Sequence, residues 1–151
     1  MKFFTPFRLA AYLLLIFCVL HTAGGMLSGR SLGQESDAVV HAMQAVRVTF
    51  GGSTGTWYGF WFGFGIMVSV FLLFSATVAW QLGNVAPEQW SSVAVIAWAL
   101  VLSQLATSIL SFQYFFAAPG VFALLAALCI AWGAIQKTRA GREASSVLRE
   151  S

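Results

Sequence analysis

Formal charge is scarce in this sequence, and it is missing altogether from three long stretches. Eight Lys and Arg residues and five Asp and Glu residues make up 9% of the chain, whereas 59% of the residues are hydrophobic. Residues 9–29, 48–87 and 89–136 contain no charged side chain. Because a charge at the centre of a bilayer costs at least ~2.5 kcal/mol, such stretches are typical of membrane spans. The sequence therefore predicts a single all-α domain surrounded mostly by lipid.

Carboxylates are especially few, and all of them lie outside the charge-free stretches. They are Glu35, Asp37, Glu88, Glu143 and Glu150. Proton-coupled transport normally uses a carboxylate inside the membrane, and paired-acid catalysis needs two that share a site. The sequence argues against both functions.

Cysteine and histidine occur only twice each. Cys18 and Cys129 lie in apolar stretches without CxxC or zinc-type spacing, which favours small buried hydrophobic residues, with a bridge between them as the alternative. Haem ligation would require His21 and His41 to face one cavity, but His41 lies on the polar face of a surface segment. We therefore expect no metal and no cofactor.

The N-terminal apolar run imitates the hydrophobic region of a signal peptide, because Lys2 and Arg8 precede it. A cleavage site after Ala23 would place His21 at a position that requires a small residue. We expect this segment to be retained as a helix.

The three stretches divide into four spans of the length that a bilayer requires, about 20 residues each. The third stretch holds two spans, because Pro119 suits the first turn of a new helix and not a helix interior. The predicted spans are about residues 8–27, 56–82, 89–112 and 118–137. They form a polytopic, up-down four-helix bundle, followed by a tail over residues 138–151.

A further segment, residues 36–50, has the pattern of a short amphipathic helix. Val39, Met43, Val46 and Phe50 recur at helical intervals opposite Asp37, His41, Gln44 and Arg47. We expect this helix to lie on the outer surface or to cap the bundle, and to end at Gly51 and Gly52.

The placement of Lys and Arg predicts the orientation of the chain. Six of the eight basic residues lie at the two ends, which face the same side if the number of spans is even: Lys2, Arg8, Lys137, Arg139, Arg142 and Arg149. Basic residues favour the cytoplasmic side, so both termini are expected in the cytoplasm. We interpret these charges as orientation signals and expect no nucleic-acid partner.

The second predicted span begins with closely spaced glycines. Gly55, Gly59 and Gly63 stand four residues apart, and Gly65 and Ser69 repeat that interval on a neighbouring face. This small-xxx-small pattern is typical of close helix packing. The alternative is a flat groove that admits a lipid or a quinone-like ring, and its walls would be Phe60, Trp61, Phe62 and Phe64.

Polar side chains of three spans are expected at similar depth in the outer half of the membrane. His21, Tyr58, Gln104 and Ser108 are the candidate residues of a weakly polar pocket. His21 is either a neutral hydrogen-bond partner, of Gln104 or of a carbonyl beside the following glycines, or a proton acceptor or metal ligand.

Three strings resemble a family of small bacterial membrane proteins with four predicted helices. They are HTAGG at residues 21–25, YGFWFGFG at residues 58–65 and YFFAAP at residues 114–119. The resemblance implies the architecture and a bacterial inner membrane, but no activity and no site residues. The size and the number of spans are more distantly similar to the DoxX-like group of redox-associated membrane proteins.

Three functions are compatible with these features. The first is a non-enzymatic bundle that binds a lipid-like ligand, a partner protein or a second copy of the chain through the glycine and aromatic face. The second is a redox or isomerising enzyme that acts on an apolar substrate with His21 and either Tyr58 or Gln104. The third is a small dimeric transporter.

Overall fold

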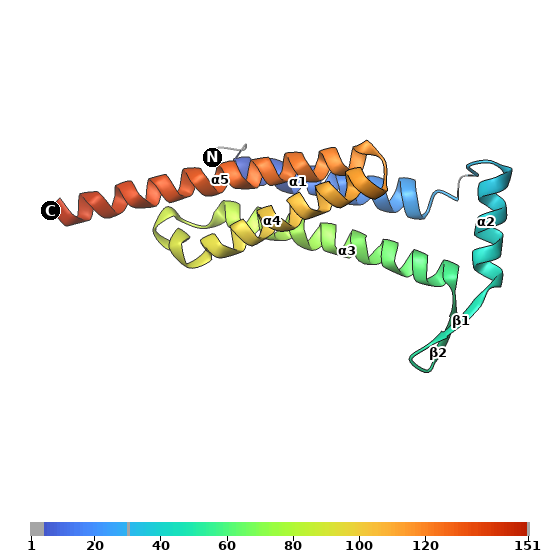
Figure 1. The fold of residues 1–151 in the computed structure, drawn as a ribbon. Helices are drawn as coiled ribbons and strands as arrows, with labels where there is room; N and C mark the ends of the chain where they lie inside the picture. The colour runs from blue at the N-terminus through green and yellow to red at the C-terminus, as the bar shows by residue number, and fades with distance from the viewer. Residues whose placement is uncertain (1–4, 30, 151) are drawn as a thin grey trace. The chain divides into compact units, whose positions relative to one another are not determined.

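The fold is a chain of helices interrupted by one β-hairpin (Figure 1). The structure is a computed structural model that describes residues 5–29 and 31–150, with side chains up to residue 143. Lys2 and the side chain of Arg149, which enter the orientation argument, lie outside this description. The helices and strands are α1 (Pro6–Val19), the π-helix η1 (Leu20–Met26), α2 (Gln34–Ala45), β1 (Arg47–Phe50), β2 (Ser53–Thr56), α3 (Trp57–Asn84), the 3-10 helix η2 (Pro87–Gln89), α4 (Trp90–Tyr114) and α5 (Ala117–Glu150).

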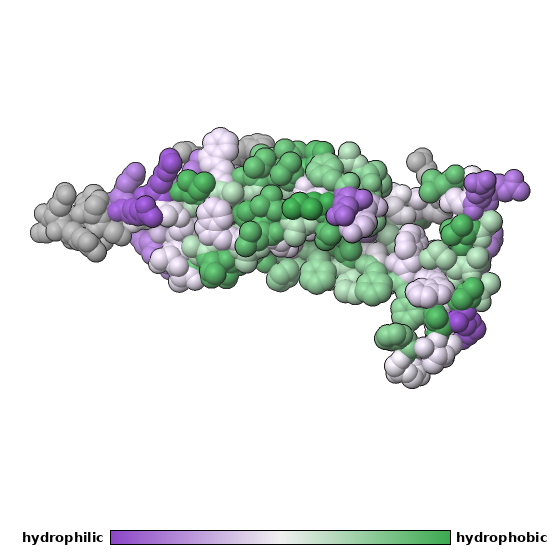
Figure 2. All heavy atoms as spheres, viewed as in Figure 1, coloured by the Kyte–Doolittle hydropathy of each residue, from purple (hydrophilic) through white to green (hydrophobic). Residues whose placement is uncertain are grey.

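Four helical segments are long and apolar enough to cross a membrane. They are Pro6–Met26, Trp57–Asn84, Pro87–Tyr114 and Ala117–Glu143. Figure 2 shows hydrophobic side chains facing outward along these helices, whereas hydrophilic ones gather on α2 and towards the end of α5. The prediction of an all-α, multi-span protein is confirmed. The fourth helix extends beyond the predicted end of its span at residue 137, because α5 continues through the basic segment to Glu150.

The chain divides into two compact units, and the divisions fall within the first and second spans. The first unit consists of the chain up to Phe17 and the chain from Leu72 onwards, and the second unit is Cys18–Phe71. The first unit therefore contains most of α1, the second half of α3, and all of α4 and α5. It holds nearly all of the fully buried side chains among the described residues.

Alanine dominates the core of the first unit and lets its helices approach closely. Phe7, Leu14 and Ile130 are the largest fully buried side chains. The small residues around them are Ala10, Ala11, Ala76, Ala79, Ala97, Ala123, Ala126, Ala127 and Ala134. A Cβ atom built on Gly133 would lie 2.7 Å from the Phe7 ring, so the glycine is what admits this ring against α5. Lipid offers helices no hydrophobic drive to associate, and such close contacts supply van der Waals attraction instead.

The turn between α4 and α5 is short and closely packed, and Figure 1 shows the two helices side by side. Helix α5 begins at Ala117, which places Pro119 in its first turn as predicted. A Cβ atom on Gly120 would lie 2.8 Å from the Phe112 ring. The chain can therefore reverse here without a longer loop.

Lys137 closes the C-terminal end of α3. Its Nζ donates hydrogen bonds to the carbonyl oxygens of Leu82 at 2.9 Å and Gly83 at 3.1 Å, and also to that of Val85. The same ammonium lies 5.7 Å from the Phe7 ring centroid and 5.6 Å from that of Trp90. The last carbonyls of a helix lack hydrogen-bond partners within the helix and carry partial negative charge. The Lys137 ammonium therefore supplies both the missing donors and a compensating positive charge.

The second unit contains η1, α2, the hairpin and the first half of α3. Helix α2 runs across the direction of α3, and the hairpin leads from α2 into α3 (Figure 1). Inside this unit η1 approaches α3 closely, because a Cβ atom on Gly65 would clash with the end of the Met26 side chain. Glycine at this position makes the approach possible.

The hairpin replaces the second part of the predicted amphipathic helix over residues 36–50. Helix α2 covers Gln34–Ala45, and the prediction is wrong from Arg47 onward, where β1 pairs with β2 in antiparallel register. Gly51 and Gly52, at φ values of 55° and 83°, form the two-residue turn. Both central residues of a type I′ hairpin turn require positive φ, and two glycines between runs with β-branched residues are a hairpin signal. The sequence pattern favoured a helix instead, because Val46 and Phe50 also fit helical spacing.

We predict that Lys137→Met lowers the free energy of unfolding by roughly 1–3 kcal/mol, because it leaves the three carbonyls at the end of α3 without their charged donor. Unfolding in mixed detergent micelles, followed by circular dichroism, measures this change. Arg139→Met removes the same charge from an exposed side chain of α5 and should have little effect. Equal losses in the two variants would contradict the capping role of Lys137.

Candidate functional site

The most concentrated group of polar side chains in the second unit surrounds Ser69 of α3. The Ser69 hydroxyl oxygen lies 3.1 Å from Nδ1 of His21 and accepts a hydrogen bond of 2.7 Å from the hydroxyl of Thr22. The thiol of Cys18 donates to the main-chain oxygen of Ser69 at 3.3 Å. Ser69 is only 8% exposed and is the one buried residue among the described residues of this unit. Polar groups from two charge-free stretches, residues 9–29 and 48–87, are thus gathered at one serine.

The hydroxyl groups of this cluster allow two complete hydrogen-bond patterns. Thr22 lies 2.7 Å from the carbonyl oxygen of Cys18 as well as from Ser69, but it has one hydroxyl proton. If Thr22 donates to Ser69, Ser69 donates to Nδ1 of His21 and the neutral ring carries its proton on Nε2. If Thr22 donates to Cys18, Ser69 donates to Thr22 and Nδ1–H of His21 donates to Ser69. The cluster therefore accommodates both neutral tautomers of His21.

The π-helix positions these residues. Cys18 belongs to the last turn of α1, and His21 and Thr22 lie at the start of η1. The wider π-turn brings three neighbouring polar residues of one helix to a single serine of α3. Single π-turns often occur at functional sites, which makes this cluster a candidate site.

Tyr58, another predicted pocket residue, lies among aromatic rings of its own helix. Its ring centroid is 5.5 Å from that of Trp61 and 6.1 Å from that of Phe62, with the second pair stacked. These contacts define an aromatic ladder along the first turns of α3.

Gln104 and Ser108 of α4 belong to the first unit and are buried there. Nε2 of Gln104 donates to the hydroxyl of Ser75 at 3.4 Å, whereas its Oε1 has no partner among the described residues. The hydroxyl of Ser108 donates to the main-chain oxygen of Gly120 at 2.9 Å. Both residues join helices of this unit.

The four predicted pocket residues thus each have identified neighbours within their own unit. The sequence offers Gln104 or a carbonyl beside Gly24 and Gly25 as a partner of His21. The structure gives Ser69 as a hydrogen-bond partner of His21 and Ser75 as that of Gln104. Convergence of all four on one pocket stays a prediction. Thr22 was missed, although its place beside His21 in the HTAGG string was an available signal. Ser69 was considered for helix packing only.

The glycines of α3 differ in what surrounds them. Gly65 contacts Met26 closely, whereas a Cβ atom on Gly63 would meet nothing within 4 Å. A Cβ atom on Gly59 would lie 3.3 Å from the hydroxyl oxygen of Thr56, the residue before α3. A Cβ atom on Gly55, which belongs to β2, would lie 3.7 Å from the Phe60 ring. Gly59 and Gly63 therefore lie on an open face of α3, and Gly65 lies on a packed one.

Large apolar side chains lie beside the open glycines. Phe60, Phe64 and Met67 are 36%, 64% and 45% exposed. Because positions three and four residues apart are neighbours on a helix, Phe60 and Met67 border Gly63 directly. We call the surface formed by Gly59, Phe60, Gly63, Phe64 and Met67 the glycine face.

Comparison of the chain with family models, with curated proteins and with solved structures gives no match. The described residues also hold no group of three or more His, Cys, Asp or Glu side chains that could bind a metal ion. The arrangement of the residues themselves is thus the basis for any functional inference.

We predict that Ser69→Ala lowers the free energy of unfolding by about 1–2 kcal/mol, because the hydroxyl group of Thr22 and the ring of His21 lose a shared partner. The ¹⁵N chemical shifts of the His21 ring should change as well. The reactivity of Cys18 should not change, since its partner is the main-chain oxygen of residue 69.

Thr77→Ala is the matched control for this variant. The Thr77 hydroxyl donates only within α3, to the main-chain oxygen of Leu73. Unaltered His21 shifts in Ser69→Ala would contradict the hydrogen bond between these side chains.

Proposed function

We propose that this protein is a non-enzymatic membrane protein that binds an apolar, lipid-like molecule through the glycine face of α3. The observation that carries the proposal is the open space at Gly63, two residues before a glycine that is tightly packed. A glycine that served only helix packing within this chain would have a neighbour at van der Waals distance. At Gly63 the backbone surface is accessible instead.

The chemistry of the glycine face suits a flat ring or an acyl chain. Backbone without a side chain at Gly59 and Gly63 provides a shallow surface, and Phe60 and Phe64 provide aromatic walls. Ligand sites are lined mostly by apolar and aromatic side chains, and aromatic rings stack favourably on planar ligands. The absence of charge from residues 48–87 favours a neutral ligand over an ionic one.

The proposed setting is the bacterial inner membrane, with both termini in the cytoplasm. The basic residues near the two chain ends and the family resemblance support this placement. The glycine face would then lie in the outer half of the membrane, where lipids, a partner protein or a second copy of the chain could all reach it. Among these, a lipid-like molecule fits best, because the face combines exposed aromatic rings with exposed backbone.

An enzyme that acts on an apolar substrate is the second candidate function. It is supported by the contact between the Ser69 hydroxyl and His21, since a hydroxyl beside an imidazole is the pairing that general bases use to activate a nucleophile. Its weakness is that Ser69 is enclosed and that a carboxylate to orient the imidazole is missing from the charge-free span.

We predict that the purified full chain carries a copurified lipid or quinone, and that Gly63→Leu reduces its amount about tenfold, a loss of ~1.4 kcal/mol in binding. Native mass spectrometry in mild detergent and organic extraction measure the molar ratio of ligand to protein. A Cβ atom on Gly63 would meet nothing within 4 Å, so the variant should fold.

Ala106→Leu is the control, because it adds the same side chain at an exposed position of α4. A wild-type protein without any bound small molecule, or equal ligand content in the two variants, would contradict the proposed function. Retention of ligand in Gly63→Leu together with its loss in Ser69→Ala would favour the second candidate.

A further inference from the structure

The β-hairpin of the second unit has two chemically different faces. In antiparallel pairing, directly opposed residues share a face and alternate residues point to opposite faces. The register pairs Val48 with Gly55 and Phe50 with Ser53, and these four positions form one face. The other face consists of Arg47, Thr49, Thr54 and Thr56.

The two faces differ in what they contact. On the polar face the hydroxyl oxygens of Thr49 and Thr54 are 3.0 Å apart and hydrogen-bonded. On the apolar face Phe50 is 81% exposed, although it is the largest side chain of the hairpin. Among the described residues, no side chain covers most of this ring, so its apolar surface requires another environment.

The hairpin is joined directly to a membrane span. Strand β2 ends at Thr56 and α3 begins at Trp57, the first residue of a helix long and apolar enough to cross a membrane. The main-chain N–H of Trp57 donates to the oxygen of Val46 at 3.3 Å, which fastens the base of the hairpin to the start of the span. Trp57 is 53% exposed, and tryptophan is typical of the boundary between membrane and water.

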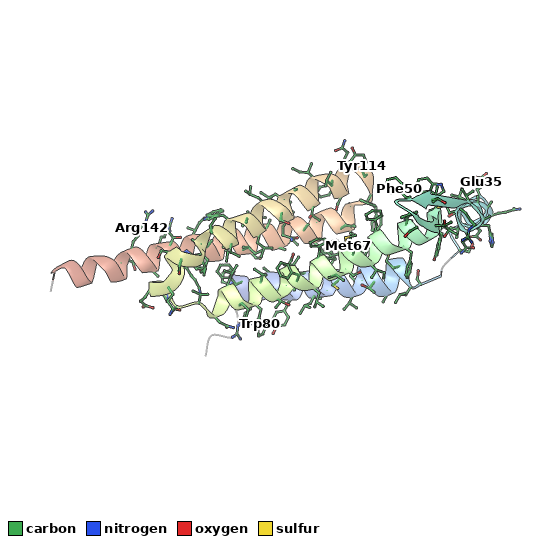
Figure 3. The ribbon with its side chains drawn as sticks, turned by 90° about the horizontal axis from the view of Figure 1, so that it is seen from below. Glu35, Phe50, Met67, Trp80, Tyr114 and Arg142 are labelled. Atoms are coloured by element: carbon green, nitrogen blue, oxygen red, sulfur yellow. The ribbon has the colours of Figure 1, made fainter. Side chains whose placement is uncertain are left out.

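The hairpin turn points back in the direction in which α3 runs, as Figures 1 and 3 show. Figure 3 places Phe50 on the side of the hairpin towards Met67 of α3, whereas Glu35 of α2 lies at the far end of the unit. The exposed ring of Phe50 therefore lies nearer to the middle of α3 than the carboxylate of Glu35 does.

We propose that this hairpin is an interfacial anchor whose apolar face, led by Phe50, inserts into the lipid leaflet that α3 enters at Trp57. A two-stranded hairpin cannot lie deeper, because the backbone groups on its outer edges lack strand partners and need water or headgroup oxygens. The polar face, with Arg47 and the three threonines, remains in contact with headgroups and water. The hairpin thereby fixes the depth at which α3, and with it the glycine face, lies in the membrane.

The test measures the depth of adjacent hairpin residues in lipid vesicles. Single cysteines are introduced as Phe50→Cys and Thr49→Cys into the full chain in which Cys18 and Cys129 are replaced by alanine, and each is labelled with an environment-sensitive fluorophore. The proteins are reconstituted into phosphatidylcholine vesicles with or without lipids that carry a quencher near the headgroup. Iodide serves as the quencher in water.

The anchor predicts opposite responses at the two neighbouring positions. The label at residue 50 should be quenched several-fold more by the lipid-borne quencher than the label at residue 49, and several-fold less by iodide. Arg47→Cys, on the same face as Thr49 and outside its hydrogen bond to Thr54, should respond as Thr49→Cys does.

Two results would overturn the proposal. Equal and strong iodide quenching at residues 49 and 50 would place the whole hairpin in water. Protection of residue 50 from both quenchers would show that protein, from a partner or a second copy, covers the ring. Neither result depends on ligand binding at Gly63, so this proposal can fail while the proposed function holds.

Discussion

The constraint on which the structure depends is that a polar group inside a membrane must find its partner within the protein. Several described polar side chains of the spans satisfy this constraint in pairs and small clusters, whereas Oε1 of Gln104 has no partner among the described residues. Ser69 joins η1 to α3, Ser75 bonds Gln104, and the hydroxyl of Ser108 bonds the carbonyl oxygen of Gly120. Lys137 extends the same principle to backbone carbonyls at a helix end. Hydrocarbon contains no water to bond these groups, so each of these hydrogen bonds satisfies a polar group that would otherwise have no partner.

The two units meet this constraint with different amounts of packing. The first unit encloses an alanine-rich core in which rings such as that of Phe7 fit against glycine. The second unit has a single enclosed residue among those described, Ser69, and leaves most aromatic side chains in its part of α3 exposed. An apolar surface of this kind is stable in lipid, and its neighbours there are lipid-like molecules. The proposed binding function and the hairpin anchor both follow from this second, open unit.

Much of the fold could be predicted because charged side chains are largely excluded from membrane spans, so that the charge pattern indicates where the spans begin and end. The positions of Arg8, Arg47 and Glu88 bound the spans, and Pro119 marks the reversal between the last two. The hairpin escaped prediction because Val46 and Phe50 fit a helical period, while the two-glycine turn carries the stronger signal through its positive φ angles. The cluster around Ser69 escaped because the partner of a buried histidine depends on helix rotation, which spacing alone leaves undetermined.

The central claim is that four helices cross one membrane, with the charged segments on two opposite surfaces. Labelling of single cysteines with a membrane-impermeant maleimide, in intact cells and after permeabilisation, tests it most directly. In a background without Cys18 and Cys129, Gln34→Cys and Phe116→Cys should be labelled in intact cells, and Glu88→Cys and Arg142→Cys only after permeabilisation. Labelling of Gln34→Cys and Glu88→Cys from the same side would contradict the account, because α3, the second of the four spans, would then not cross the membrane.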